Sequence, residues 1–478
     1  MEKNNYSSPY RLEGKLPLGQ AVLYGLQHVL AMFAGNLTPI ILILGACGIE
    51  ASDVVRVSIL QNAMLVAGLI TLVQLFTIGP IGGRLPIVMG TSSGFIGVCS
   101  GVAASMGGGI VAYGAIMGAS LLGGLFEMVL GFCLKPLRRF FPSVVTGTVV
   151  MAIGLSLIGV GINSFGGGSG KGDFGSLPNL FVGTVVLLTI VLLKHFTKGA
   201  TSAASILVGI IVGYIVCAVM GLVLPHTYVD AEGAEQTCSW VLNWSSVGAA
   251  SWFTIPKIIG VNLKDSAGEV VKLVFDARAI IPIMIMFIVT AVETVGDISG
   301  ITEGGLGREA TDKELSGGVV CDGFGSSVAA AFGVLPNTSF SQNVGLVGMT
   351  KVVNLYAISM GAIFLILCGL FPKLAAVVNI MPQSVLGGAA VMMFASIVVS
   401  GIQLVTKEAV NAKSITIVAV ALGLGYGLGA NSAILANMPS YISYIFGGSG
   451  IVPAAIIAII LNIVIPDESK AEKHAAGK

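Results

Sequence analysis

The chain has 478 residues, of which 55% are hydrophobic and 10% charged, with a formal net charge of +1 at pH 7. This composition is far more apolar than that of a soluble globular protein, and the balanced charge offers no basic surface for a nucleic acid. The 66 glycines have no collagen-like period and lie mostly in apolar stretches, as in close-packed membrane helices. A membrane protein is therefore predicted.

Apolar windows long enough to cross, or half-cross, a bilayer follow one another along the chain. They are predicted at 20–44, 54–78, 85–104, 108–133, 142–162, 178–196 and 201–223, and then, after a polar loop, at 279–300, 315–331, 338–349, 352–371, 383–402, 412–430 and 449–465. Windows 85–104 and 338–349 are polar or short, so we expect broken or half-helices there. The polar N-terminal residues show no signal-peptide pattern.

Fourteen segments would leave both termini on the same side of the membrane. If that side is cytoplasmic, Lys194, Lys198, Lys407 and Lys413 lie inside, as the positive-inside rule requires. We therefore expect a multi-pass protein of the cytoplasmic membrane. Its predicted soluble parts are a cytoplasmic N-terminus at 1–19, an extracellular loop at 224–278 and a cytoplasmic tail at 466–478.

The chain carries a sign of internal duplication. PSVVTGTVVMAIGLSLIGVGI, at 142–162, and PQSVLGGAAVMMFASIVVSGI, at 382–402, agree without gaps at six positions. These are the fifth and twelfth predicted segments, and an odd separation means that they enter the membrane from opposite sides. This favours two inverted repeats, at 20–223 and 279–465, over a chance similarity between helices rich in Gly and Val.

The third and tenth segments are counterparts in the same register. They read GRLPIVMGTSSGFIGV at 83–98 and VLPNTSFSQNVGLVGM at 334–349, each with a proline, then hydroxyl residues, then an apolar run containing glycine. Interrupted segments at matching positions of two halves point to a binding site near the middle of the membrane, where half-helix N-termini favour electron-rich groups. The alternative is a pair of packing kinks.

Glu293 lies inside the apolar run IPIMIMFIVTAVETVGDI at 281–298, and Asp297 follows one helical turn later. A carboxylate inside a span costs roughly 2.5–3.5 kcal/mol on insertion scales. Residues at i and i+4 share one helix face. This pair indicates a substrate or proton pathway, and the alternative is a paired carboxylate that only locks helix packing.

These features resemble the nucleobase–ascorbate transporter family, in its bacterial xanthine and uric acid permease branch. The resemblance rests on Q-N-x-G-x-x-x-x-T-K at 342–351, on Gln27 and His28, on ETVGD at 293–297 and on Asp322. It implies an all-α membrane protein of fourteen transmembrane segments in two inverted repeats of seven, acting as a homodimer in membrane lipid. It also implies a core domain, 20–133 with 279–371, and a gate domain, 142–223 with 383–465.

The resemblance assigns substrate contacts to this chain. The carboxylate of Glu293 would accept two N–H groups of a purine edge, and the amide of Gln342 would read a C=O beside an N–H. Phe340 would stack on the ring, backbone amides near Ser93 would complete the slot, and Asn343 would fix the backbone or the Gln342 side chain.

Proton coupling and site organisation are expected from His28, Asp297 and Asp322. His28 is expected to bridge the first and eighth segments through its two ring nitrogens. Which of Glu293, Asp297 and Asp322 carries the proton stays open.

The implied activity is uptake of xanthine and/or uric acid with protons, by alternating access and without a cofactor or metal. Ser92 stands where xanthine-selective relatives tend to have Asn, and the smaller hydroxyl leaves room for the C8 oxygen of urate. A uracil permease is disfavoured by Gln342 and Asp297, and an anion exchanger would not need Glu293. An intramembrane enzyme or a receptor-like protein fits less well, since the chain has no HExxH motif, nucleotide loop or nucleophile elbow.

Overall fold

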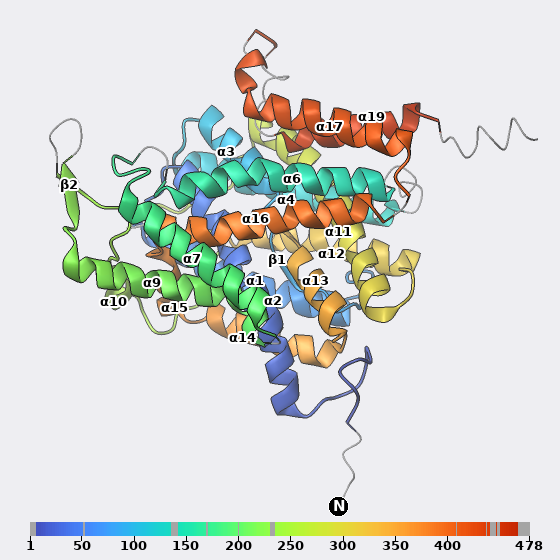
Figure 1. Ribbon diagram of the computed structural model, residues 1–478, viewed down its shortest axis with the longest axis horizontal. Helices are drawn as coiled ribbons and strands as arrows, with labels where there is room; N and C mark the ends of the chain where they lie inside the picture. The colour runs from blue at the N-terminus through green and yellow to red at the C-terminus, as the bar shows by residue number, and fades with distance from the viewer. Residues whose placement is uncertain are drawn as a thin grey trace, which may run out of the picture.

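The structure is a computed structural model that describes residues 6–466 except 51–52, 135–141, 169–170, 199, 230–234, 408, 436, 440–445 and 447–449. The predicted cytoplasmic tail and the first five residues therefore lie almost wholly outside it. The described chain is mainly helical and has two small sheets of two strands each (Figure 1).

Each predicted apolar window contains a helix. The first half consists of α1 (Leu18–Ala46), α2 (Val54–Phe76), β1 (Met89–Thr91), α3 (Phe95–Ser105), α4 (Gly109–Phe132), α6 (Ser143–Phe165), α7 (Leu177–Phe196), α8 (Ala200–Ala203) and α9 (Ser205–Val223). The polar loop holds the β2–β3 hairpin (Thr227–Val229, Glu235–Thr237) and α10 (Ser245–Ala249). The second half consists of α11 (Ala277–Leu306), α12 (Asp312–Ala331), β4 (Asn337–Ser339), α13 (Ser341–Thr350), α14 (Leu355–Gly369), α15 (Pro372–Asn379), α16 (Gln383–Val405), α17 (Ala412–Ala430), η2 (Ser432–Leu435) and α19 (Ile451–Val464).

Nine helices of the described chain are long and apolar enough to cross a membrane, and up to ten if α14 and α15, bent by 83°, count as one span. This number indicates an integral membrane protein. The count of fourteen stays a prediction. Windows 85–104 and 338–349 are each a strand followed by a short helix, and α12 begins with the charged residues Asp312, Lys313 and Glu314.

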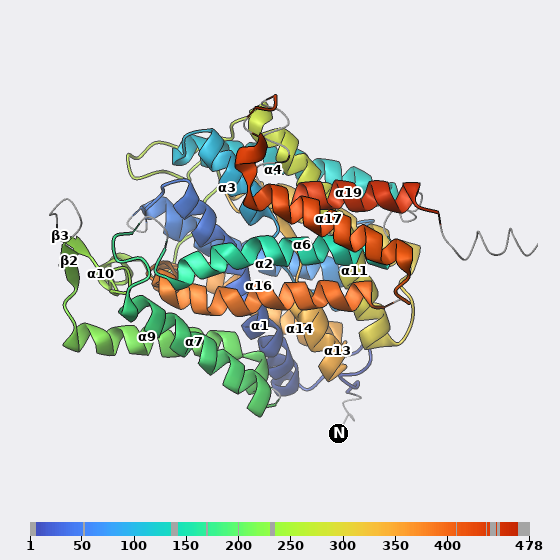
Figure 2. The same ribbon diagram turned by 45° about the horizontal axis from the view of Figure 1, so that its top comes forward.

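Helices α6 and α16 lie side by side in both views (Figures 1 and 2). Each is 23 residues long and follows a proline N-cap, Pro142 or Pro382. Glycines bring the two backbones together, because a Cβ added at Gly147 would lie 2.7 Å from the carbonyl oxygen of Gly401. Dispersion contacts between small residues thus replace the hydrophobic driving force that helices lack in lipid.

The remaining helices form two groups. In one, α17 and α19 pack against each other and against α6, while α7 and α9 pack against each other and against α16 (Figure 2). In the other, α1 and α2 pack on α14, while α11 and α12 pack on α4. In this second group, α1 and α2 of the first half therefore pack on a helix of the second half. Likewise, α11 and α12 of the second half pack on a helix of the first half.

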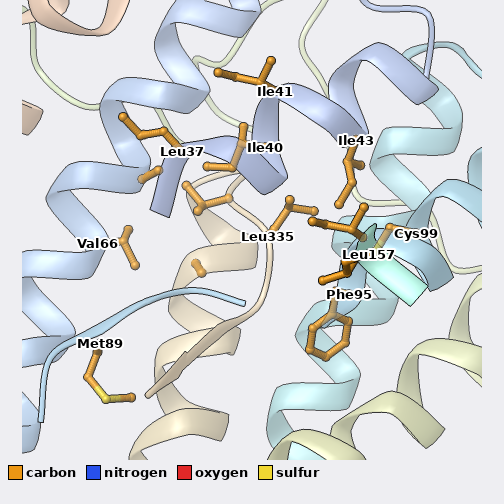
Figure 3. Close-up of a cluster of buried hydrophobic side chains, with 14 of the residues drawn as sticks. Leu37, Ile40, Ile41, Ile43, Val66, Met89, Phe95, Cys99, Leu157 and Leu335 are labelled. Atoms are coloured by element: carbon orange, nitrogen blue, oxygen red, sulfur yellow. The ribbon is translucent and has the colours of Figure 1, made fainter. Parts of the chain in front are cut away.

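Buried aliphatic and aromatic side chains fill the space around the strands β1 and β4. Figure 3 shows Leu37 and Ile40 of α1, Phe95 of α3 and Leu157 of α6, each at most 1% exposed. Leu335, just before β4, belongs to the same cluster. The short strands are therefore held within an apolar shell that supplies few polar partners, so their backbone groups must be satisfied by particular side chains.

Candidate functional site

The two broken segments meet as an antiparallel strand pair, with Gly90 of β1 opposite Thr338 of β4. Side chains of the long helices hold the strand β1. The backbone N–H of Thr91 donates to Oδ1 of Asn36 at 2.8 Å, and that of Met89 donates to Oγ1 of Thr71 at 2.9 Å. Each strand leads into a short helix, α3 or α13, so two helix N-termini start from this pair.

The ring of Phe340 packs between α1 and β1. A Cβ added at Gly35 or at Gly90 would lie 2.7 Å from a carbon of this ring, and Phe340 is only 5% exposed. Both glycines are therefore needed for the close approach of the ring. Stacking of this ring on a substrate stays a prediction.

Glu293 and Asp297 lie one turn apart on α11 and both are buried, each at 8% exposure. Oδ2 of Asp297 accepts hydrogen bonds from the hydroxyls of Ser339 at 2.6 Å and Ser341 at 3.1 Å. One carboxylate oxygen of Glu293, Oε2, is buried without a hydrogen-bond partner in the described chain. Asp297 is thus bound to β4 and α13, while Glu293 keeps an oxygen for another group.

Asp322 of α12 is fully buried and belongs to the same network. Its Oδ2 accepts from the hydroxyls of Thr294 and Thr338, the second at 3.1 Å. The Thr294 hydroxyl also lies 3.2 Å from that of Ser339, which donates to Asp297. Hydroxyl groups therefore connect Asp322 to Asp297, although the two residues come from different helices.

His28 and Asn343 are paired with each other. Nδ2 of Asn343 lies 3.0 Å from Nδ1 of His28 and also donates to the carbonyl oxygen of His28 at 3.0 Å. An amide nitrogen can only donate, so Nδ1 accepts, which leaves the ring proton on Nε2. The sequence led us to expect that His28 meets α11 and that Asn343 holds its own backbone or Gln342. The observed partner of each is the other, because α13 starts beside α1.

The remaining predicted residues lie around β1 and α13. The backbone N–H of Ser92 donates to the carbonyl oxygen of Pro336 at 2.8 Å, and its buried hydroxyl has no partner among the described residues. Ser93 is half-buried in the turn before α3. Gln342 is the second residue of α13, but its side chain lies outside the described part of the chain, so its contact with substrate remains a prediction.

One buried carboxylate was missed by the sequence reasoning. Glu127 of α4 is fully buried, and its Oε1 accepts from the hydroxyl of Thr290 on α11 at 3.1 Å. The signal was present, because Glu127 is the lone charged residue of the apolar run LLGGLFEMVLGF. The rule that singles out Glu293 as a carboxylate inside a span applies equally to Glu127.

The site borders α6 and α16. A Cβ added at Gly296 of α11 would lie 3.0 Å from Cγ2 of Thr146 on α6, and one added at Gly35 would lie 3.3 Å from Cε of Met393 on α16. Buried carboxylates and hydroxyls dominate the site, and they can accept hydrogen bonds from N–H groups. Such a site suits a planar ligand with N–H donors.

Comparison with known proteins agrees with this chemistry. The family model Xan_ur_permease, described as a permease family, matches residues 19–434. The chain is 33% identical to the xanthine permease XanP of Escherichia coli (strain K12), over 96% of this chain and 95% of that protein. It is 31% identical to the uric acid permease PucK of Bacillus subtilis (strain 168), over 93% and 95%. Its fold is similar to that of the murine Slc26a9 anion transporter, with a TM-score of 0.59 and 12% identity, over 97% of this chain and 73% of that one.

Proposed function

This chain belongs to the family of xanthine and uric acid permeases, and we propose that it carries oxidised purine nucleobases, xanthine and/or uric acid, into the cell together with protons. Membership of the family confirms the predicted class, which is a membrane transporter of the purine permease type and not an enzyme. The substrates named for the relatives support the proposal, since their sequences match this chain over 96% and 93% of its length.

One observation carries the substrate proposal. The strand pair β1–β4 brings the two halves of the chain together, and Ser339 of β4 donates from its hydroxyl to Asp297 of α11. Oδ2 of Asp297 already accepts from Ser339 and Ser341, whereas Oε2 of Glu293 has no partner in the described chain. Glu293 would accept N–H groups of the purine edge in charge-assisted hydrogen bonds, with Gln342 reading the neighbouring C=O and N–H and Phe340 covering the ring.

Proton coupling is proposed for the carboxylates that share this network. A substrate-bound carboxylate and a second one nearby interact strongly, so that protonation of one depends on the charge of the other. Asp297 and Asp322 are linked through Thr294 and Ser339. Together with His28, they would hold the site in shape and exchange the coupled proton.

Transport would proceed by alternating access in the cytoplasmic membrane, with both termini in the cytoplasm and two subunits in the working unit. The core domain would be 20–133 with 279–371, and the gate domain would be 142–223 with 383–465. Support comes from the equal lengths and proline caps of α6 and α16, and from the crossed packing of α1 and α2 on α14 and of α11 and α12 on α4. This is the arrangement expected of two inverted repeats.

An anion exchanger is the main alternative, because a solved anion transporter has a similar fold. At 12% identity that likeness concerns the fold alone. The chemistry of the site favours a ligand with ring N–H donors, because the carboxylates of Glu293, Asp297 and Asp322 are hydrogen-bond acceptors and an inorganic anion such as chloride has no N–H to donate. A uracil carrier is the second alternative, and it is disfavoured by Gln342 and Asp297.

Uptake of radiolabelled xanthine tests the proposal, in cells that lack their own purine carriers and in the presence of excess urate, guanine, hypoxanthine or uracil. We expect urate to compete about as well as xanthine, and Ser92→Asn to weaken urate more than xanthine because the larger side chain takes the space of the C8 oxygen. Competition by uracil alone would contradict the assignment of Gln342. An absence of uptake would favour the exchanger.

A further inference from the structure

The packing of α4 does not require a carboxylate at position 127. It is fully buried in α4, and its Oε1 accepts one hydrogen bond, from Thr290 of α11. Its Oε2 is buried with no hydrogen-bond partner among the described residues. Among the residues that the structure describes, ion pairs are formed by other acidic side chains, namely Glu13, Asp276, Glu314 and Glu303. None of these pairs involves Glu127.

The groups that face Glu127 are themselves acidic. Helix α4 packs on α12, α11 and α3. Thr290, which donates to Glu127, lies one turn before Glu293 on α11, and Gly323, which lies against Gly124 of α4, follows Asp322 on α12. Helix α3, FIGVCSGVAAS, has no charged side chain. Small residues keep these helices close, since a Cβ added at Gly124 would lie 2.6 Å from the carbonyl oxygen of Gly323.

An ionised carboxylate in such a place is expensive. A buried charge without a cation is normally avoided, and two neighbouring carboxylates disfavour it further. A neutral carboxylic acid avoids this cost, and it carries a proton that it can transfer to another group. A residue needed only for packing could equally be Gln, Met or Leu at this position, and each would remove the cost.

We propose that Glu127 is a further proton-carrying residue of the transport cycle. It holds a proton as a neutral acid and passes it to the carboxylate of Glu293 or Asp322 when that group is free of substrate, so that one O–H bond breaks as another forms. The reverse transfer restores the acid. Thr290 orients the carboxyl group through Oε1. The inference rests on the proposed proton-coupled uptake.

The decisive variant is Glu127→Gln, which keeps the size and the acceptor oxygen for Thr290 but cannot exchange a proton. Purified protein in liposomes is tested in two assays, accumulation of xanthine under an imposed pH difference and exchange of xanthine across the membrane without one. One pH unit can drive about tenfold accumulation by a one-proton symporter. We expect exchange within about twofold of the parent's and accumulation lost.

Two further variants separate this role from a structural one. Glu127→Asp keeps a titratable group and should retain accumulation with an altered pH profile, even if the amide variant does not fold. Glu309→Gln, an exposed residue after α11, makes the same charge change and should behave as the parent. Accumulation by Glu127→Gln with the parent's pH profile would overturn the proposal.

An infrared measurement keeps this inference distinct from the proposed function. A neutral carboxylic acid has a C=O stretch that a carboxylate and an amide lack, and we expect Glu127→Gln to remove such a band from the spectrum of the parent. Absence of that loss means that Glu127 is ionised and the proposal is wrong. If the parent does not transport xanthine or urate, the proposed function fails, while the band still decides whether Glu127 holds a proton.

Discussion

The carboxylates around α11 differ in what is left for a ligand. Asp297 accepts two serine hydroxyls and Asp322 accepts two threonine hydroxyls, all from within the protein. Oε2 of Glu293 and Oδ1 of Asp322 are both buried without a hydrogen-bond partner in the described chain. Asp297 is therefore suited to organising β4 and α13. Of the other two carboxylates, Glu293 is 8% exposed and Asp322 is fully buried, so Glu293 is the better placed to meet substrate. A buried acceptor left unpaired is costly, and a bound N–H group would remove that cost.

Glu293→Gln is expected to abolish uptake and to weaken xanthine binding by a factor of ten or more, because its amide N–H₂ would face a substrate N–H and one charge-assisted bond of about 1.5–3 kcal/mol would be lost. Binding by thermal shift and uptake in cells measure both effects. Glu309→Gln is the control of equal charge change. Transport close to that of the parent would remove Glu293 from the substrate site.

Gly90→Ala is expected to reduce uptake at least about tenfold, since displacements near 1 Å at a site can cost that much or more. The added methyl group would lie 2.7 Å from carbons of both Met32 and Phe340, so the ring of Phe340 must shift. Gly345→Ala is the control, because a Cβ there meets nothing within 4 Å. Equal uptake by the two variants would mean that the ring position does not matter for transport.

At the scale of elements, close approach between backbones explains why glycine is so abundant. Gly147 of α6 meets Gly401 of α16, and Gly154 meets the backbone of Val398 farther along the same pair. The strands are short, and the buried backbone N–H groups of Met89 and Thr91 in β1 donate to side chains of α2 and α1. Broken segments are therefore tolerated only because neighbouring helices provide partners.

Gly147→Val should destabilise the protein by about 1–3 kcal/mol, the usual range for an overpacked contact. Its Cβ would lie 2.7 Å from the carbonyl oxygen of Gly401 and 2.8 Å from the backbone nitrogen of Val405, and backbone atoms cannot move aside easily. Gly159→Val lies on the same helix, where a Cβ meets nothing within 4 Å. The stability of the two variants is compared by heating each in detergent and measuring the fraction of protein that stays monodisperse. Equal midpoint temperatures for Gly147→Val and Gly159→Val would contradict the packing of α6 on α16.

At the scale of the whole molecule, the proposed core and gate meet through close packing and through an ion pair. Gly296 of α11 lies against Thr146 of α6, and Nζ of Lys407, after α16, lies 2.7 Å from Oε1 of Glu303 on α11. The polar loop 224–278 also touches both proposed domains. The hydroxyl of Ser239 in this loop donates to Asp173 of the gate at 2.8 Å, and Asn62 of the core donates to the carbonyl oxygen of Lys257 in the loop at 2.6 Å. Movement of one domain against the other would change the contacts that join the two domains directly.

Glu303→Lys should alter the rate of xanthine exchange by no more than about fivefold while changing stability by less than about 1 kcal/mol, because both side chains are partly exposed and such pairs are weak. Its physical effect is to place two like charges where the domains meet. The double variant Glu303→Lys with Lys407→Glu restores opposite charges and should return the rate towards that of the parent. Failure of the double variant to recover would show that this pair does not influence domain movement.

The sequence by itself determined the membrane class, the positions of the helices and the family. Apolar windows such as 142–162 and 412–430 depend on local composition, and the signature at 342–351 is a run of neighbouring residues. Glu293 and Asp297 could be placed on one face because helical geometry relates residues four apart.

Only the tertiary structure decided which distant groups meet. The pairing of His28 with Asn343, the hydroxyl bridge from Asp322 to Asp297 and the contact of Glu127 with Thr290 join residues from different elements. Their distances depend on how close the helices approach, which glycines such as Gly124 set through contacts with another helix. Local sequence patterns carry the period of a helix, but the partner across an interface is fixed by packing between helices, to which the whole chain contributes.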